Sequence, residues 1–194
     1  MFTRRAAGQH GLSLIEQIVF IVIVSVAVAG VLAALTLSTR SSADPMLQKQ
    51  ALAIAEAILE EVQLQPLTYC DPDDANAPTA LSSAGCTGGA TGPNDENGNP
   101  PAALGTEGVE SRTAIPLYDN VSDYNGLTIN PITDLNGTPL GLDGYSATIA
   151  VTRQGLGAIP AAEALLISVT VTGPGNTTVA LHGYRMRYAP NALP

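Results

Sequence analysis

The amino-acid sequence predicts an α+β fold in which a long N-terminal helix packs on a C-terminal antiparallel β-meander. A run of 20 mostly apolar residues, 18–37, is long enough to cross a bilayer as a helix. A second helical pattern follows it directly, and apolar residues alternate with polar ones from Tyr145 onward. We therefore expect a helix with a transmembrane half and an amphipathic half, with the amphipathic half lying on the sheet.

Charges flank the apolar run asymmetrically. A helix of that length, at ~1.5 Å per residue, measures about 30 Å, the thickness of the hydrocarbon core of a bilayer. Arg4 and Arg5 precede the run, and no acidic residue stands before Glu16. This asymmetry predicts a single-pass membrane protein with a cytoplasmic N-terminus and an exported remainder.

Three interpretations of this segment compete: a cleaved secretory signal, a simple anchor and a prepilin segment. Residues 27–29, Ala-Val-Ala, offer the small residues that ordinary signal cleavage needs. A simple anchor requires the apolar run alone. Residues 11–16, Gly-Leu-Ser-Leu-Ile-Glu, place a carboxylate where the chain enters the membrane. A buried carboxylate costs about 2.5–3.5 kcal/mol at mid-membrane, so Glu16 is expected to have a partner.

Residues 11–16 resemble the N-terminal cleavage and methylation motif of type IV pilins and type II secretion pseudopilins. The resemblance implies a pilin-like fold and cleavage between Gly11 and Leu12 by a prepilin peptidase, which also N-methylates Leu12. Leu12 and Ser13 stand where the family most often has Phe and Thr. The resemblance also implies that Glu16 pairs with the N-terminal amine of a neighbouring subunit during assembly.

A helical pattern resumes after the span, over residues 44–66. Asp44 is the expected N-cap and Pro45 a first-turn residue. One apolar face is formed by Leu47, Ala51, Ile54, Ala55, Ile58 and Val62. We expect one long helix, kinked or briefly broken near Pro45 and ended by Pro66, whose outer half covers the soluble domain.

Two cysteines, Cys70 and Cys86, lie in a stretch rich in Gly, Pro, Asn and Asp at residues 69–111. An exported chain meets an oxidising compartment, so an even number of cysteines indicates one disulfide. Closing a loop of this size stabilises the fold by roughly 3 kcal/mol. The stretch has no C-x-x-C spacing and no histidine, which disfavours a metal or redox pair.

Carboxylates in the same region have the oxygen ligands that Ca²⁺ prefers. The candidates are Asp71, Asp73, Asp74, Asp95 and Glu96. Their spacing does not match an EF-hand loop, and Asp, Asn, Gly and Pro are the usual residues of turns. We expect no cofactor, with calcium at these residues as the alternative.

Period-two alternation predicts strands at residues 145–153 and 165–172, a turn at 173–176 and a third strand after it. Three such strands form an antiparallel meander whose apolar face needs a covering element, which the helix supplies. In the third strand the apolar residues change parity at Gly183. This change predicts a β-bulge there that turns Arg185 and Arg187 outward together.

The chain is therefore expected to divide into five parts. These are a leader (1–11), a transmembrane helix (12–40), the amphipathic half of the helix (41–66), a loop-rich region (67–134) and a sheet (135–194).

Without the leader, the chain contains six basic residues and 17 acidic ones. This balance disfavours the basic groove that nucleic-acid binding requires.

The sequence offers little material for catalysis. His10 lies in the leader, which leaves His182 as the remaining histidine. Nucleophile-elbow, phosphate-loop and zinc-binding spacings are absent from the sequence. We expect a protein that is processed by an enzyme and is not one itself.

The resemblance extends along most of the chain and is closest to minor pilins of mannose-sensitive haemagglutinin type pili. It is carried by residues 42–62, 118–126, 134–152 and 183–190. It implies a low-copy structural subunit of the inner membrane with a periplasmic domain, which later joins a filament at the cell surface. The partners that it implies are prepilin peptidase, other major and minor pilins, an inner-membrane assembly platform and membrane lipid. Two alternatives remain: a minor pseudopilin of type II secretion, and an adhesive binding module displayed on a fibre, since long loops suit surface recognition.

Overall fold

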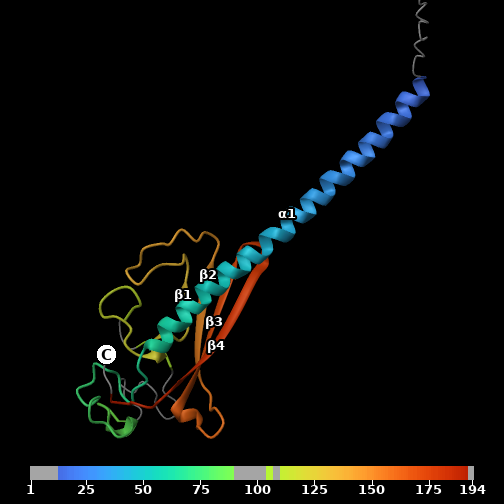
Figure 1. Ribbon diagram of the computed structural model, residues 1–194. Helices are drawn as coiled ribbons and strands as arrows, with labels where there is room; N and C mark the ends of the chain where they lie inside the picture. The colour runs from blue at the N-terminus through green and yellow to red at the C-terminus, as the bar shows by residue number, and fades with distance from the viewer. Residues whose placement is uncertain (1–12, 90–103, 107–109, 192–194) are drawn as a thin grey trace, which may run out of the picture. The chain divides into compact units, whose positions relative to one another are not determined.

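The computed structural model describes residues 13–89, 104–106 and 110–191, which fall in two compact units, Met1–Pro45 and Met46–Pro194 (Figure 1). One helix, α1 (Leu14–Leu64), passes through both units. The strands are β1 (Thr128–Ile129), β2 (Ser146–Arg153), β3 (Ala164–Gly173) and β4 (Thr177–Met186). Four short 3₁₀ helices are η1 (Ser83–Gly85), η2 (Val121–Tyr124), η3 (Ala161–Glu163) and η4 (Pro174–Asn176).

In the first unit, the segment Leu14–Thr36 of α1 is long and apolar enough to span a membrane, with a mean hydropathy of 3.1. All of its side chains are exposed. Its two hydroxyl groups bond within the helix: Ser25 Oγ donates to the carbonyl of Ile21 at 2.7 Å, and Thr36 Oγ1 donates to that of Leu32 at 2.8 Å. Such internal bonding is what a hydrocarbon environment demands of polar groups.

Helix α1 continues through Pro45, so the predicted helix start at Asp44 was wrong. A proline inside a helix removes one backbone hydrogen bond and crowds the preceding turn, but it does not always end the helix. The C-terminal end agrees better with the sequence. The helix stops at Leu64, just ahead of Pro66, because a residue that precedes proline disfavours the helical conformation.

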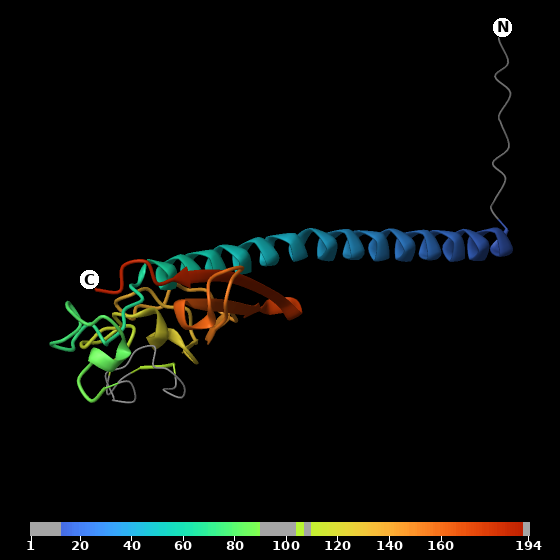
Figure 2. The ribbon, with the colours of Figure 1, turned by 90° about the horizontal axis from the view of Figure 1, so that it is seen from below.

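In the second unit, the predicted apolar face of α1 is confirmed. Its buried members are Ala51, Ile54, Ala55, Ile58 and Val62, and Leu47 packs at the margin of the same core. The opposing side of the core comes mainly from alternate residues of β2 and β3: Ala147, Ile149, Val151, Leu165, Ile167, Val169 and Val171. The architecture is one helix lying on one sheet (Figure 2). The coarse α+β prediction is therefore confirmed.

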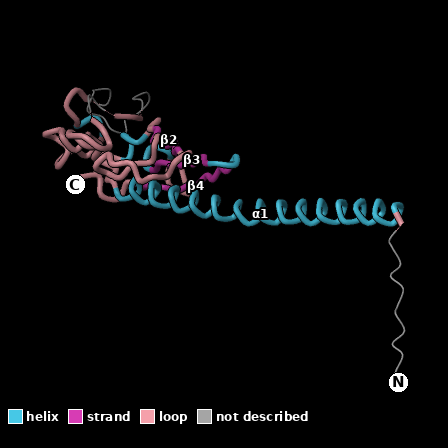
Figure 3. Tube along the Cα trace, turned by 90° about the horizontal axis from the view of Figure 1, so that it is seen from above, coloured by secondary structure: helices cyan, strands magenta, loops and turns pink. Residues whose placement is uncertain are grey.

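The sheet is an antiparallel meander in the order β1-β2-β3-β4. The three long strands are those that the alternating pattern predicts. Strand β1 is an addition, within the region predicted to be loops, because two residues are too few to show a periodic pattern. Most of the remaining chain is loop, as Figure 3 shows.

The predicted β-bulge at Gly183 was wrong. Strands β3 and β4 pair without interruption from Ala164↔Met186 to Gly173↔Thr177. The glycine has a different purpose: a Cβ at position 183 would overlap Nε2 of Gln63 and lie 3.1 Å from Cδ1 of Leu59. Gly183 therefore lets α1 approach β4 closely.

Arg185 and Arg187 are not a pair of solvated side chains. The guanidinium of Arg185 lies 5.1 Å from the centre of the Tyr188 ring. The side chain of Arg187 is 4% exposed and forms an ion pair with Glu163 at 3.4 Å. Its guanidinium also lies 4.5 Å from the centre of the Tyr69 ring. Because the register is unbroken, the two arginines remain against the domain.

Candidate functional site

The residues predicted for processing lie at the start of the chain. Gly11 and Leu12 fall outside the described residues. Glu16 stands in the first turn of α1, at the N-terminal end of the apolar segment Leu14–Thr36, and is exposed. A carboxylate in this position is favoured by the positive end of the helix dipole. The described part of the chain offers it no cation within ion-pair distance.

The predicted disulfide is confirmed. Cys70 and Cys86 are bonded, with their Cα atoms 5.4 Å apart, and both are buried. They form a small second core with Ala77 and Ala80. Asn191 ties the C-terminal end to this core, because its Nδ2 donates to the carbonyls of Ala77 and Ala80 at 2.8 Å each.

Asp74 serves the fold of the disulfide loop. Its Oδ1 accepts from the backbone N–H of Asn76 at 2.9 Å and from the hydroxyl of Thr87 at 2.8 Å, and its Oδ2 accepts from the backbone N–H of Thr87 at 2.7 Å. Burial opposes ionisation of this carboxyl, but the bonds from Asn76 and Thr87 outweigh it and hold the pKa of Asp74 below its ordinary value. Asp74 is thus a clamp on Thr87 and not a member of a cluster with Asp71 and Asp73.

Four other carboxylates meet beside this loop and are called the acidic cluster here. One oxygen from each of Asp71, Asp73, Glu110 and Asp119 lies within 4.8 Å of the others. Asp71 is buried, Asp73 is exposed, and the other two are half-buried. Carboxylate oxygens at such spacing can share a proton or a hard cation.

The 3₁₀ helix η2 positions one side of the acidic cluster. Asn120 caps it with a capping box: its Oδ1 accepts from the N–H of Ser122, while Oδ2 of Asp123 accepts from the N–H of Asn120 at 2.8 Å. Asn120 Nδ2 donates to Thr68 Oγ1 at 2.6 Å, which fixes the turn against the segment that follows α1. Asp119, directly before the cap, is therefore held next to Asp71.

Burial and the charges of the acidic cluster shift the protonation of Asp119, a member of the cluster, and of its neighbour Asp123. Burial, followed by the charges of Asp71, Glu110 and Asp73, raises the pKa of Asp119 to about 7. Burial also raises the pKa of Asp123 above its ordinary value, and the nearby Asp119 and Asp71 add to this effect. Near neutral pH, the cluster therefore carries less negative charge than its composition indicates.

Of the five candidate calcium ligands, the structure brings together Asp71 and Asp73. Asp74 is engaged elsewhere, and Asp95 and Glu96 lie outside the described residues. Glu110 and Asp119 were not predicted from the sequence. Their spacing in the sequence gives no signal that could have revealed them. Calcium binding stays a prediction, now attached to a different set of carboxylates.

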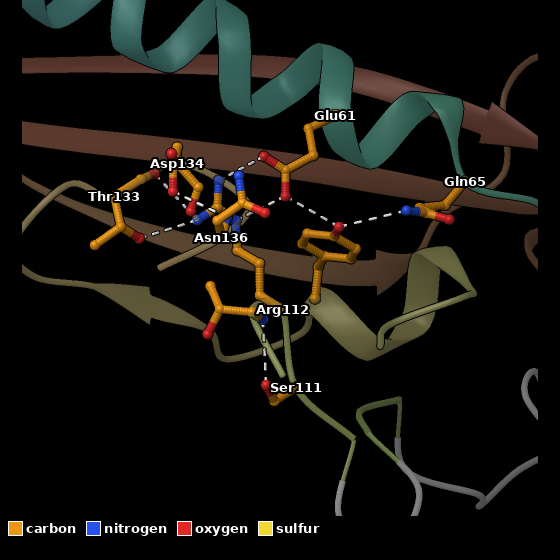
Figure 4. A network of polar contacts seen from close by, with 9 residues as sticks. Glu61, Gln65, Ser111, Arg112, Thr133, Asp134 and Asn136 are labelled. Carbon is orange, nitrogen blue, oxygen red and sulfur yellow. Dashed lines mark hydrogen bonds and ion pairs between the residues drawn. The ribbon is translucent and has the colours of Figure 1, made fainter. Parts of the chain in front are cut away.

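A second polar site, also missed from the sequence, joins the outer half of α1 to the loops (Figure 4). Arg112 donates two parallel hydrogen bonds to Glu61, from Nε to Oε1 at 2.7 Å and from Nη2 to Oε2 at 2.8 Å. Its Nη1 donates to Thr133 and to the carbonyl of Asp134, at 3.2 Å in each case. The side chains are 8% and 15% exposed for Arg112 and Glu61, so this ion pair is largely withdrawn from water.

Tyr124 extends the same network. Its hydroxyl donates to Oε1 of Glu61 at 3.0 Å and accepts from Nε2 of Gln65 at 3.4 Å. The hydrogen bond to Glu61 raises the pKa of Arg112, and burial together with the charge of Glu61 raises the pKa of Tyr124. The charges of Glu61 and Arg112 thus neutralise each other within the domain. The network therefore has a structural role: it holds the loops to α1.

A cavity of about 610 Å³ lies next to this ion pair. Its walls are mostly aliphatic: Ala53, Ala57 and Ile58 come from α1, and Ile132, Leu140 and Leu142 come from the loop that follows β1. Since Arg112 and Glu61 bind each other, they leave no spare charge to activate a substrate. The cavity suits an apolar group, and its lining also includes Asp134.

His182 lies on the outer face of the sheet, where its Nδ1 is 2.9 Å from Oγ of Ser168. Neither residue belongs to the acidic cluster or to the cavity at α1.

Comparisons with protein-family models, with curated proteins and with solved structures found no match to this chain.

Proposed function

We propose that this chain is a minor type IV pilin, most similar to the D component of mannose-sensitive haemagglutinin type pili. In this proposal, prepilin peptidase cuts between Gly11 and Leu12 and N-methylates Leu12. The mature chain then stays in the inner membrane until it joins or initiates a pilus filament. The observation that carries the proposal is the placement of Glu16 in the first turn of a helix, at the N-terminal end of the exposed, mostly apolar segment Leu14–Thr36.

Glu16 has a direct role in this proposal. Cleavage leaves a positively charged amine on Leu12, and the amine of one subunit pairs with Glu16 of its neighbour. A subunit in the wrong register leaves both charges unpaired in an apolar environment, which is strongly unfavourable. The ion pair therefore selects one axial position for each incoming subunit.

The rest of α1 supports the same role. The helix supplies both the apolar segment Leu14–Thr36 and the buried face that begins at Ala51. Because this face belongs to the core of the second unit, α1 is an integral part of that domain. The expected partners are prepilin peptidase, other major and minor pilins, the inner-membrane assembly platform and membrane lipid.

The first test is the intact mass and the N-terminal residue of the full chain recovered from membranes. The chain is expressed in matched cells with and without prepilin peptidase. The expected result is a chain that begins at N-methylated Leu12 in the first cells and at Met1 in the second. A chain that begins at Gly30 in both would indicate ordinary secretion, and an uncut chain beside active peptidase would indicate a simple anchor; either result overturns the proposal.

A further inference from the structure

The two edges of the sheet are built differently. At one edge, β1 has two residues and is followed by Asn130 and Pro131. At the other edge lies β4 (Figure 1). The ten residues of β4 (Thr177–Met186) are all paired with β3; they include no Pro, Lys, Asp or Glu, and the charge of Arg185 stands near the C-terminal end. Natural sheets protect their edges with short strands, proline, charge or bulges. The β1 edge has such protection, whereas β4 is long and regular.

The backbone groups on the open side of β4 can be identified from the hydrogen-bond pattern. The N–H of Arg187 donates to the carbonyl of Glu163 at 3.0 Å, next to the pair Ala164↔Met186. Hydrogen-bonded pairs alternate along an antiparallel ladder, so the odd-numbered residues of β4 bond to β3. The N–H and C=O groups of Thr178, Ala180, His182 and Tyr184 therefore point outward. Within the described residues, these groups have no hydrogen-bond partner.

Apolar surface continues past this edge on the side of α1. Val179 and Leu181 of β4 pack on the core but are only half-buried. Leu59 is half-buried and Leu52 is 37% exposed. These two leucines are seven residues apart and so share one flank of the helix, with the exposed Glu56 between them. The contact between Leu59 and Gly183 shows that this flank faces β4.

A cation stands at the C-terminal end of the edge. Nε of Arg185 is buried without a hydrogen-bond partner in the described part of the chain. The hydrogen bond of its Nη1 to Tyr188 Oη is long, at 3.5 Å. The side chain of Arg185 lies on the same side of β4 as Leu181, because residues of equal parity share one face. A carboxylate from outside would complete the hydrogen bonding of this guanidinium.

We infer that β4 is a docking edge for an extended segment of a different protein chain, which adds to the sheet as a fifth strand. The segment has apolar residues on the side that faces Leu52 and Leu59. It has an acidic residue beside Arg185. Main-chain hydrogen bonds supply the affinity and alternate side chains supply the selectivity, as in other cases of β-strand addition.

A second copy of this chain fits the edge less well. Leu47 lies near Gly175, and Leu59 lies near Gly183, so the outer half of α1 and strand β4 run in the same direction. Antiparallel pairing of two β4 strands would therefore direct the outer halves of the two α1 helices oppositely. In either direction, a second β4 contains no Asp or Glu and would supply no carboxylate beside Arg185.

The test uses the full chain in detergent micelles and a synthetic peptide, acetyl-Glu-Thr-Val-Thr-Val-Thr-Val-amide. Added antiparallel to β4, this peptide places Glu beside Arg185 and the valines toward α1. Hydrogen exchange of the β4 amides is followed by mass spectrometry. The expected result is about tenfold slower exchange at Ala180, His182 and Tyr184. The same peptide with N-methyl groups on alternate residues keeps the side chains, loses the backbone donors and gives no protection.

Two variants at one position sharpen the test. Ala180→Pro removes an outward N–H without removing a bond to β3, and protection by the peptide is expected to vanish. Ala180→Val keeps the N–H and is expected to retain protection. Unchanged exchange at millimolar peptide, or equal protection by the N-methylated peptide, overturns the inference even if Ala180→Pro fails to fold. Protection that depends on protein concentration without peptide would show self-pairing and also overturn it, while leaving the processing test above unaffected.

Discussion

The ring of Tyr145 fills the space beside Gly173: a Cβ added to the glycine would overlap Cε1 of the ring and lie 2.7 Å from its Cδ1. The ring is 4% exposed, and its hydroxyl lies 3.1 Å from Oε1 of Gln50 on α1. Gly173 has an extended backbone, with φ of −145°, which any residue adopts. The position therefore requires glycine because of space and not because of backbone conformation.

We predict that Gly173→Ala lowers the free energy of unfolding by about 1–3 kcal/mol, because the buried ring cannot move aside. Gly183→Ala is expected to cost less, since the overlapping atom, Nε2 of Gln63, is the end of a flexible side chain. Urea unfolding followed by near-ultraviolet circular dichroism measures both, since the chain has six tyrosines and no tryptophan. Adding Gln63→Ala is expected to relieve Gly183→Ala and to leave Gly173→Ala unchanged. Equal costs for the two glycine variants would contradict this account.

The ion pair of Glu61 and Arg112 gives a second prediction. Arg112→Met leaves Glu61 largely buried without its cation and is expected to cost about 3–5 kcal/mol of stability. The double variant Glu61→Gln with Arg112→Met removes both charges and is expected to recover more than half of the loss. Tyr124→Phe, which removes one hydrogen bond from the same network, serves as the control and is expected to cost about 1 kcal/mol. A double variant as unstable as Arg112→Met would show that the charge left behind is not the cause.

The raised pKa of Asp119, about 7, predicts how stability depends on pH. The ordinary pKa of an aspartate is ~3.9, so between about pH 4 and 7 the folded chain binds more protons than the unfolded chain. The free energy of unfolding therefore falls as pH rises through this range. In the Asp119→Asn variant, the decrease in the free energy of unfolding over this pH range is expected to be smaller by about 1 kcal/mol. This figure allows for the screening of the partly exposed cluster by solvent.

Urea midpoints measured at intervals from pH 4 to 8 test the effect of Asp119. The variant is expected to match the parent chain at pH 4 and to exceed it above pH 7. Asp143→Asn, at an exposed carboxylate outside the acidic cluster, is the matched control and is expected to leave the profile unchanged. A parallel shift of the Asp119→Asn curve at every pH would point to altered packing and not to titration.

The disulfide supplies a fourth prediction. Replacing both Cys70 and Cys86 with Ser is expected to cost roughly 3 kcal/mol, because the bond closes a loop whose ends are 16 positions apart. Reduction of the parent chain with dithiothreitol is expected to give the same loss. The double variant should not respond to the reductant, and a response there would mean that the loss has another origin.

Under the proposed function, Glu16 gives a prediction about filament assembly. Glu16→Gln removes the charge and keeps the shape, so cleavage after Gly11 is expected to continue while the amount of chain in sheared filaments falls about tenfold or more. Gln17→Ala, at the next exposed position of the same helix turn, is expected to assemble normally. Immunoblots of filament and membrane fractions measure both. Normal incorporation of the Glu16→Gln chain into filaments would contradict the charge-pair mechanism.

The parts of the fold that were predictable from the sequence are those that local periodicity determines. The face of α1 at Ala51, Ile58 and Val62 is buried because apolar residues there repeat at the helical period. The long strands follow alternation with period two, and the disulfide follows from there being two cysteines in a region that the sequence predicts to be exported. Each of these features is a property of nearby residues or of composition.

The missed features depend on contacts between distant residues. Glu61 and Arg112 are 51 positions apart, and the loop that joins them has no regular pattern. Asp119 reaches Asp71 through a capped turn whose position is set by Thr68. Around Gly183 the sequence shows that the apolar residues change parity, but it does not show that α1 passes close to this position. A bulge and a close helix–strand contact both call for glycine, and the sequence alone did not separate them.

The unequal edges of the sheet limit how this domain can build larger structures. Because β1 is short and Pro131 lies close behind it, the sheet can grow on the side of β4 alone. A polymer that propagates through sheet edges needs one donor edge and one acceptor edge on every subunit. This domain has one open edge, β4, instead of two. A contact through β4 therefore joins one partner to one domain and cannot be repeated to build a polymer.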